Sequence, residues 1–397
     1  MRETVRPNKA ECTGCGACVS ICPKKAITMV PDDEGFLYPA VDSALCVGCD
    51  LCEKRCPVGK DVPARQQKAF AVQHMDHQVR GLSSSGGVFT ALARGMLARG
   101  GVVFGAAFDE NLHVEHIGAF NEAEIASMRG SKYVQSDASE AIENAASLLA
   151  RGIPVLFSGT PCQIAGLKAK LGGKYDDLLL TVDFVCHGVP SPGVFASYLN
   201  MLEKESGKKV VSYFFRDKRK GWKDFSAVAV FEDGSEHAGD QRTEPFLYGF
   251  LQNLYLRPSC AQCTAYRGKH HLSDLTMADL WGAEQICPEK DDDTGLSLVF
   301  ANTKNGMDAL KRCGAEVERF SIQNIEAIRR MNPSIWQPAS HHEKRRVFFA
   351  RYQKNGFERD YVMKLLSGPG RFERIIRRIA HLPFGAMRRL RALFARR

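Results

Sequence analysis

The sequence predicts a small cysteine-rich α+β domain, then an α/β core with a mostly parallel sheet, and then a helical, basic C-terminal tail. Three observations predict this fold class. Eight of the 14 cysteines lie between Cys12 and Cys56. Strand-like apolar runs alternate with helix-like runs from residue 68 to residue 205, which is typical of a parallel sheet covered by helices. Nine arginines and one glutamate occupy residues 371–397.

The elements of the core follow from the apolar pattern. The expected strands are 69–72, 101–108, 113–120, 153–159 and 178–185, and the expected helices are 86–99, 121–127, 138–150, 161–171 and 192–205. Pro161 suits the first turn of a helix, where its missing N–H is not needed. Residues 209–235 predict a β-hairpin. We divide the chain into a cysteine-rich domain (1–63), two parts of the core (64–150 and 151–330), a helical extension (331–370) and the tail (371–397).

The positive charge is concentrated at the end of the chain. The 54 Lys and Arg against 45 Asp and Glu give a net charge of +9, but without the tail the remainder is 45 against 44. A nearly neutral body carrying none of the nucleic-acid motifs argues against nucleic acid as a partner. The tail places Phe372, Ile375 and Ile379 on one helical face. This amphipathic pattern predicts peripheral contact with the inner face of a membrane, with a partner protein or a solvated tail as the alternatives.

The start of the chain is polar, and the sequence has no run of 18 apolar residues. Neither a signal peptide nor a transmembrane helix is therefore expected. Fourteen cysteines without a secretory signal favour a reducing compartment with metal-bound thiolates. We expect a cytoplasmic protein.

A cysteine pattern in the first 57 residues occurs twice. Each copy has three cysteines at a spacing of three, then a fourth that is followed by proline; the two runs are Cys12, Cys15, Cys18, Cys22 and Cys46, Cys49, Cys52, Cys56. In such runs the fourth cysteine ligates the other cluster. We therefore predict one [4Fe–4S] cluster on Cys12, Cys15, Cys18 and Cys56, and a second on Cys46, Cys49, Cys52 and Cys22. Zinc, the alternative, favours two separated CxxC pairs. The region resembles a bacterial-type, two-cluster ferredoxin domain, which implies electron transfer.

Two glycine- and serine-rich corners are candidate ligand sites. The first, Ser83, Ser84, Ser85, Gly86 and Gly87, precedes an expected helix. Its amides and hydroxyls suit an anion such as a pyrophosphate, although the GxGxxG pattern is absent and a plain helix cap is the alternative. The second corner contains Gly130, Ser131, Lys132 and Tyr133. There a lysine is suited to a phosphate or an electron-rich ring, and a tyrosine to stacking; a solvated lysine and a packed tyrosine are the alternative.

Four cysteines of the core are scattered along the sequence. Cys162 lies in the first turn of an expected helix, Cys186 follows an expected strand, and Cys260 and Cys263 form a CxxC pair. In a parallel sheet the first two would emerge at the same edge, where ligands bind. Four thiolates suffice for a third [4Fe–4S] cluster; a zinc-binding or redox-active CxxC beside two buried cysteines is the alternative. Cys287 and Cys313 have no partner spacing and are expected to be ordinary apolar residues.

These segments together resemble the family of coenzyme F420 hydrogenase/dehydrogenase beta subunits over residues 65–300. The matching stretches are SSSGGVFTALA (83–93), RGSKYVQSD (129–137), SGTPCQIAGLK (158–168), DFVCHGVPSP (183–192), FRDKRKGW (215–222) and CAQC with DLTMADLWG (260–282). The resemblance implies a non-covalent FAD and a [4Fe–4S] cluster on Cys162, Cys186, Cys260 and Cys263. With Thr160, the residues of the two corners are the candidates for FAD binding.

The resulting hypothesis is an FAD- and iron–sulfur-dependent oxidoreductase. A flavin passes electrons between a two-electron partner, such as a deazaflavin or a nicotinamide, and one-electron clusters. Lys132 and His187 are the candidate catalytic residues; a hydrogen bond near the cluster is an equally good role for His187. The expected partners are ferredoxin or another redox subunit and a small redox substrate. The alternatives are an electron-transfer subunit without its own substrate chemistry, and an iron–sulfur sensor or scaffold.

Overall fold

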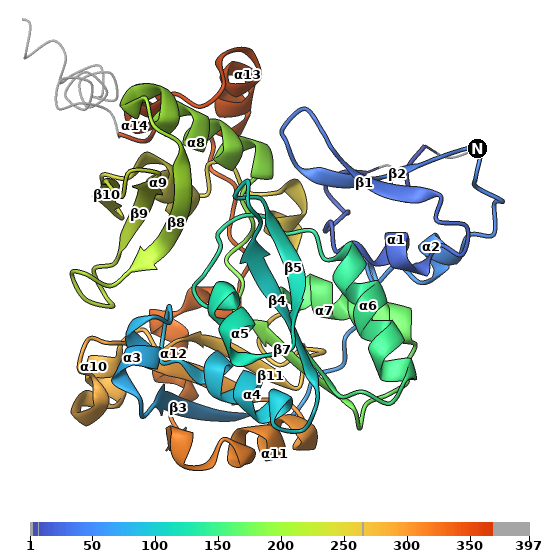
Figure 1. The fold of residues 1–397 in the computed structure, drawn as a ribbon, viewed down its shortest axis with the longest axis vertical. Helices are drawn as coiled ribbons and strands as arrows, with labels where there is room; N and C mark the ends of the chain where they lie inside the picture. The colour runs from blue at the N-terminus through green and yellow to red at the C-terminus, as the bar shows by residue number, and fades with distance from the viewer. Residues whose placement is uncertain (1–2, 7, 264–265, 368–397) are drawn as a thin grey trace, which may run out of the picture.

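A computed structural model describes residues 3–6, 8–263 and 266–367. The N-terminal unit is a small α+β arrangement that lies beside the rest of the chain (Figure 1). It contains strands β1 (Ile27–Pro31) and β2 (Leu37–Val41), which pair antiparallel, and the short helices α1 (Ala17–Ile21) and α2 (Leu51–Lys54). The turn between the strands is fixed by Asp32, whose carboxylate accepts hydrogen bonds from the amides of Glu34 and Phe36.

A twisted eight-stranded sheet forms the centre of the described part of the core, in the order β13-β3-β12-β11-β7-β6-β4-β5. Its strands are β3 (Lys68–His74), β4 (Val102–Phe108), β5 (Val114–Ala119), β6 (Val155–Ser158), β7 (Leu179–Phe184), β11 (Leu275–Asp279), β12 (Ser297–Ala301) and β13 (Val317–Ile322). The neighbours β11, β7, β6 and β4 are parallel, and the outer pairings are antiparallel. Five of these eight strands, β3, β4, β6, β7 and β11, run in the same direction.

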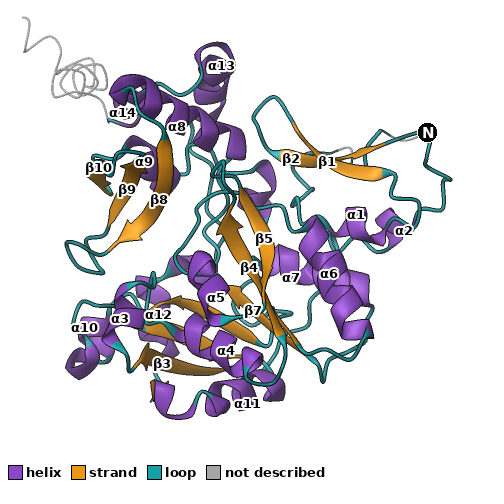
Figure 2. Cartoon of the chain, viewed as in Figure 1, coloured by secondary structure: helices purple, strands orange, loops and turns teal. Residues whose placement is uncertain are grey.

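Helices cover both faces of this sheet (Figure 2). They are α3 (His77–Gly81), α4 (Val88–Leu97), α5 (Glu122–Met128), α6 (Ser139–Ala150), α7 (Pro161–Leu171) and α11 (Lys304–Arg312). Successive strand residues point to opposite faces: Val103 and Leu156 pack with α4, α5 and α11, whereas Phe104 and Phe157 pack with α6 and α7. The strands are buried on both sides, which explains their continuous apolar sequence.

A second, three-stranded antiparallel sheet lies apart from the first, in the order β10-β9-β8. Its strands are β8 (Val210–Asp217), β9 (Ser226–Phe231) and β10 (Glu236–Asp240). Helices α8 (Pro192–Ser206), α9 (Pro245–Leu251), α13 (Arg345–Asn355) and α14 (Arg359–Leu366) share an aromatic-rich core with it. The remaining elements are α10 (Ala283–Ile286), α12 (Ile325–Met331) and the 3₁₀ turns Pro258–Gln262, Pro288–Lys290, Gly314–Glu316 and Pro333–Ile335.

The structure confirms the mostly parallel sheet and corrects the expected core in two places. Five strands of the sheet run in one direction, and β5, β12 and β13 run against them. The expected hairpin at 209–235 gains a third strand, β10, whose sequence EHAGD has no apolar alternation. The expected helix at 86–99 begins at Val88, and the short helix α3 stands between the preceding strand and the serine corner.

The predicted amphipathic tail, 371–397, lies outside the described residues. Among the helices that are described, none has the length and apolar character needed to cross a bilayer.

Candidate functional site

The first cysteine-lined cavity lies in the N-terminal unit. Cys12, Cys15, Cys18 and Cys56 all line it, together with Thr13, Gly14 and Gly16. The fourth cysteine comes from the second run, so the structure brings together the ligand set that the crossed spacing predicts. Gly14 and Gly16 have positive φ angles of 67° and 77°, a conformation that glycine adopts without strain. Burial raises the pKa of the Cys15 thiol to about 11.

A second cavity is lined by Cys22, Cys46, Cys49 and Cys52. Cys22 reaches it from the end of the first run, where its sulfur accepts a hydrogen bond from the amide of Ala26 at 3.3 Å. Cys49 is exposed, as are the neighbouring side chains Val47 and Leu45. This cavity is therefore close to the protein surface.

A third cavity brings together the four scattered cysteines of the core. Cys162, Cys186, Cys260 and Cys263 line it, with Tyr266 and His271 beside them. The parallel pairing of β6 with β7 explains the convergence, because Cys162 and Cys186 follow the carboxyl ends of these two neighbouring strands. Burial raises the pKa of the Cys186 thiol to about 12 and raises that of Cys162 as well.

Helix α7 fixes Cys162 in its first turn. Thr160 is the N-cap: its side chain accepts from the amide of Gln163, and the Gln163 side chain accepts from the amide of Thr160 in return. Thr160 Oγ1 also lies 3.1 Å from the Cys162 sulfur. The residue that caps the helix therefore also contacts the thiol.

The three sets of cysteines fit four-iron clusters in their donor chemistry. The four cysteines of each set line one cavity, and all fourteen cysteines are free of disulfide bonds. Among the described residues, no group of three or more Cys, His, Asp or Glu side chains is arranged to hold a single metal ion. Cys287 and Cys313 instead lie in apolar clusters of the core, as their lack of partner spacing predicts.

The cavity of the core and the first cavity of the N-terminal unit are neighbours. Thr13 lines both of them. Tyr266, on the wall of the core cavity, donates a hydrogen bond to the carbonyl of Pro57 at 3.4 Å, next to Cys56. Gly166 of α7 is so close to Cys15 that a Cβ built on it would lie 3.2 Å from the sulfur.

A fourth and larger cavity, of about 640 Å³, opens beside the core cysteines. It falls within the ordinary size range of small-molecule sites, roughly 300–1,000 Å³. Almost all of the candidate flavin-binding and catalytic residues line it: Ser83, Ser84, Ser85, Gly87, Gly130, Ser131, Lys132, Tyr133, Thr160 and His187. Cys186, Thr160 and Gly188 belong to its wall and to the wall of the core cysteine cavity.

The two glycine- and serine-rich corners meet at this cavity. The amide of Ser131 donates to Ser84 Oγ at 2.6 Å, and the two hydroxyls lie 3.0 Å apart. Gly86 does not line the cavity: its Cα faces β3, where a Cβ would lie 2.4 Å from the carbonyl oxygen of Val72. Gly86 is therefore packed against β3, and its role in cofactor binding stays a prediction.

Lys132 and His187 both line the cavity, and both form hydrogen bonds with neighbouring residues. Lys132 Nζ donates to the carbonyls of Ser127 and Arg129 at 2.8 and 3.0 Å, at the end of α5. Burial lowers the pKa of Lys132 to about 7. His187 Nε2 lies 2.5 Å from Asn253 Oδ1, and burial lowers the pKa of the ring. The Tyr133 ring stacks on Phe250 with centroids 4.6 Å apart.

Three more residues line the cavity, Arg216, Asp279 and Trp281, and the sequence did not predict them as site residues. Arg216 forms a buried ion pair with Asp279, while its Nε and Nη2 find no hydrogen-bond partner among the described residues. Trp222 donates to the same carboxylate at 3.1 Å and stacks on Trp281 with centroids 5.0 Å apart. These residues lie within the matching stretches 215–222 and 274–282, but the charge and aromatic pattern alone does not show that the two stretches meet.

Comparison with family models identifies most of the chain. Residues 69–143 and 154–327 match the N-terminal and C-terminal parts of the coenzyme F420 hydrogenase/dehydrogenase beta subunit. Residues 11–60 match a 4Fe-4S dicluster domain. The two beta-subunit matches together span well over half of the sequence. The chain belongs to the family of coenzyme F420 hydrogenase/dehydrogenase beta subunits and carries a 4Fe-4S dicluster domain ahead of the family core, which confirms the resemblance seen in the sequence.

Similar proteins include one of the subunits of the F(420)H(2) dehydrogenase of Methanosarcina mazei, 23% identical over 188 residues, which are 44% of this chain and 53% of that protein. An uncharacterized ferredoxin of Methanocaldococcus jannaschii is 38% identical over 50 residues, 13% of this chain and 64% of the ferredoxin. The chain thus spans about half to two thirds of the length of these relatives. A solved structure of the F420-reducing [NiFe] hydrogenase complex from Methanosarcina barkeri superposes with a TM-score of 0.47 at 18% identity, covering 69% of this chain and 90% of that chain.

Proposed function

We propose that the chain is an oxidoreductase that uses FAD and three [4Fe–4S] clusters. It passes electrons between a two-electron substrate at the flavin and a one-electron redox partner at the N-terminal unit. The observation that carries this proposal is the series of adjoining cavities. The 640 Å³ cavity shares Cys186 and Thr160 with the core cysteine cavity, and that cavity shares Thr13 with the first cavity of the N-terminal unit.

The large cavity suits FAD in its charges and its shape. Helix α4 starts at its wall with Gly87 as the N-cap, and no side chain caps the first amides. Such a helix end attracts an anion, so we assign the pyrophosphate to Ser83, Ser84, Ser85 and Gly87. The apolar and aromatic side, with Tyr133, Phe225 and Trp281, suits a flat ring system.

FAD would supply the conversion between paired and single electrons. The chain's own residues bind and orient it. Lys132, held at the end of α5, presents its ammonium to the negative charge of the ligand. Nε and Nη2 of Arg216, which lack a hydrogen-bond partner within the described part of the chain, are available to an electronegative atom of the flavin or of the substrate. His187 follows Cys186 in the sequence and lines the large cavity, so it is suited to hold or pass a proton there.

The content of iron and flavin tests this proposal. Anaerobically reconstituted protein is expected to hold about twelve irons, because three four-iron clusters are proposed, and one FAD that is released on denaturation. Cys162→Ala is expected to remove the core cluster's share of the iron and to leave the share of the N-terminal unit. Cys313→Ala, a buried cysteine outside the cavities, is the matched control and keeps all of the iron. Eight irons and no flavin in the unaltered protein would refute the proposal.

A second candidate function is an electron-transfer subunit that depends on a partner for substrate chemistry. The relative from M. mazei is named as a subunit of a dehydrogenase, and the exposed Cys49 brings the second cavity to the surface. The two functions differ in flavin reduction. A subunit without substrate chemistry would bind FAD, yet no bleaching would follow the addition of reduced F420, NAD(P)H or reduced ferredoxin.

The basic tail 371–397 adds a proposal of its own, which rests on the sequence alone. Its amphipathic arginine-rich pattern suits an anionic membrane surface. Co-sedimentation of the full chain and of a 1–370 truncation with anionic vesicles tests this; equal binding by the two proteins would refute it.

A further inference from the structure

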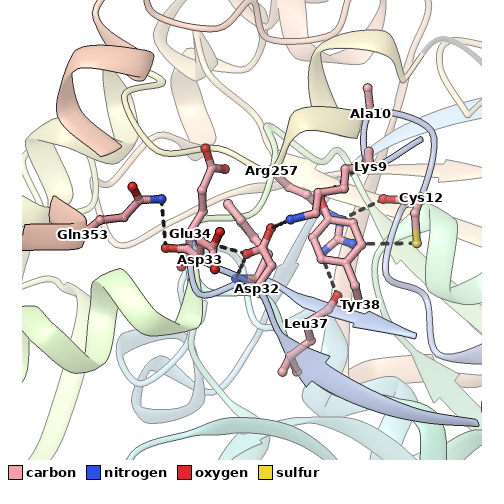
Figure 3. A network of polar contacts seen from close by, with 12 residues as sticks. Lys9, Ala10, Cys12, Asp32, Asp33, Glu34, Leu37, Tyr38, Arg257 and Gln353 are labelled. Atoms are coloured by element: carbon pink, nitrogen blue, oxygen red, sulfur yellow. Dashed lines mark hydrogen bonds and ion pairs between the residues drawn. The ribbon is translucent and has the colours of Figure 1, made fainter. Parts of the chain in front are cut away.

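Arg257 connects the core to the cysteines of the N-terminal unit. Its backbone belongs to the segment that carries Cys260, since the Cys260 amide donates to the Arg257 carbonyl at 3.0 Å. Its side chain extends in the other direction and is fully buried, with 0% exposure. The guanidinium donates to the carbonyl of Cys12 at 2.9 Å and approaches the Cys12 sulfur at 3.8 Å. Figure 3 shows this arrangement.

The other contacts of the guanidinium are neutral. It donates to the carbonyl of Leu37 and to Gln135 Oε1, each at 3.0 Å, and it lies 3.9 Å from the centroid of the Tyr38 ring. A cation over an aromatic face is attracted to it, but the ring carries no net charge. The ion pairs among the described residues do not include Arg257.

The nearby carboxylates are already engaged with other cations. Asp32 pairs with Lys9 at 2.7 Å, and Glu34 pairs with Arg345, whose Nη1 lies 2.9 Å from Glu34 Oε1. Burying a charge without an opposite charge is costly. An anionic group at the Cys12 sulfur would supply the missing counter-charge, and a [4Fe–4S] cluster held by four thiolates carries a net negative charge.

The cysteine run itself leaves room for the guanidinium. Gly14 lies between Cys12 and Cys15, and a Cβ built on it would be 2.8 Å from the guanidinium carbon and 2.5 Å from Gln135 Nε2. Arg6 offers a contrast on the same cavity. Its side chain is 25% exposed and it lies 3.8 Å from Glu11, so water and a carboxylate already reduce its effect.

We propose that Arg257 is a positioning residue that holds the Cys12 run against the core and raises the reduction potential of the cluster on Cys12, Cys15, Cys18 and Cys56. Reduction adds one electron, and therefore one negative charge, to this cluster, whereas an arginine side chain always carries a positive charge. The positive charge stabilises the reduced form more than the oxidised form, so the potential rises. The electron comes from the core cluster, or from dithionite in the test. This inference rests on the part of the proposed function that assigns this cluster.

Potentiometric titration of the full chain, monitored by electron paramagnetic resonance, tests the inference. In Arg257→Gln we expect one midpoint potential to fall, with the reduced-to-oxidised ratio of that cluster about tenfold lower at a fixed potential, which corresponds to 59 mV for one electron. The other midpoints should move less. In Arg257→Lys the charge is retained without the planar fork, so a smaller fall is expected.

The double variant Glu34→Gln/Arg345→Gln is the matched control. It removes an ion pair between the core and the N-terminal unit without changing the net charge, so all midpoint potentials should stay as in the unaltered protein. Equal potentials in Arg257→Gln and the unaltered protein would overturn the inference, as would the same fall in the control. If Arg257→Gln loses iron while the control keeps it, the holding role is supported. The tuning role is then tested with Gln135→Glu, which places a carboxylate at the hydrogen bond to the guanidinium and should lower the midpoint potential; an unchanged midpoint would overturn the tuning role. The iron content of the unaltered protein tests the presence of the cluster separately.

Discussion

Gly166 allows the N-terminal unit to approach the core closely. It lies one turn after Cys162 in α7, and a Cβ at this position would be 3.1 Å from the Ala17 Cβ and 3.2 Å from the Cys15 sulfur. Carbon atoms pack best at about 3.5–4.0 Å. A methyl group on Gly166 would therefore force α1 and Cys15 away from α7 by a few tenths of an ångström.

Two opposing effects set the expected size of a Gly166→Ala change. Replacing glycine by alanine inside a helix stabilises it by about 1 kcal/mol. Inserting a methyl group into a tightly packed contact costs about 1–3 kcal/mol. The net result is expected to lie between no change and a destabilisation of about 2 kcal/mol.

Gly95→Ala provides the matched comparison. Gly95 lies within α4, and a Cβ built there meets no atom of the described residues within 4 Å. The helix effect acts alone, so this variant should be stabilised by about 1 kcal/mol. Gly166→Val, with two further methyl groups, should be less stable than Gly166→Ala and should lose iron from the cavity of Cys12, Cys15, Cys18 and Cys56.

Thermal unfolding and iron content of the anaerobic proteins measure these effects. The expected order of stability is Gly95→Ala first, then the unaltered protein, then Gly166→Ala and Gly166→Val. Equal stabilisation by Gly166→Ala and Gly95→Ala would show that α1 and Cys15 do not press on α7 at this point. The conclusion that the two cysteine cavities lie close together would then be wrong.

Three further changes test the proposed sites. Thr160→Val removes the cap of α7, which should lower the stability by about 1 kcal/mol. It also removes the hydroxyl that lies 3.1 Å from the Cys162 sulfur. Since hydrogen bonds to sulfur tune cluster potentials, the reduction potential of the core cluster should fall in this variant and stay unchanged in Thr160→Ser. Lys132 has a pKa of about 7 because it is buried, so it is charged below pH 7 and neutral above. FAD affinity measured by fluorescence should therefore fall as the pH rises from 6 to 8, and Lys132→Met should show weak, pH-independent binding; an unchanged pH profile in this variant would contradict the role. Asp279→Ala leaves Arg216 buried without its partner and should lower the stability by about 3–5 kcal/mol, while Asp279→Asn should cost less; a loss below 1 kcal/mol in thermal unfolding of the alanine variant would show that the pair is not buried.

The cysteine spacing predicted the two sets in the N-terminal unit because the pattern is local. The first three cysteines of each run are three residues apart and lie in one short segment. The fourth cysteine of each run lines the cavity of the other run, Cys56 that of the first and Cys22 that of the second. The repeated spacing already predicts this exchange. The centre of the sheet was predictable for a related reason. Strands such as β6 and β7 are buried on both faces, so their apolar runs stand out.

Other features could not be predicted, because their residues do not follow the simple apolar pattern of a buried element. The edge strand β13 has a mixed pattern, VERFSI, since one of its sides faces solvent. In the sequence, Gly86 looks the same as a phosphate-binding glycine. In the structure, β3 and the amide of Ser297 lie so close to it that no side chain would fit. Only the pairing of distant strands distinguishes these two reasons for a glycine.

The sequence by itself determined the family and the two crossed cysteine sets, and through the family resemblance it implied that four of the six other cysteines share one cluster. The tertiary structure decided that these four converge, because β6 and β7 are parallel neighbours and a turn 74 residues after Cys186 brings Cys260 to them. It also decided that Arg257, three residues before Cys260, reaches Cys12 across 245 positions of chain. Contacts of this kind depend on packing between units that no local pattern records, and this packing sets the order of the proposed redox sites.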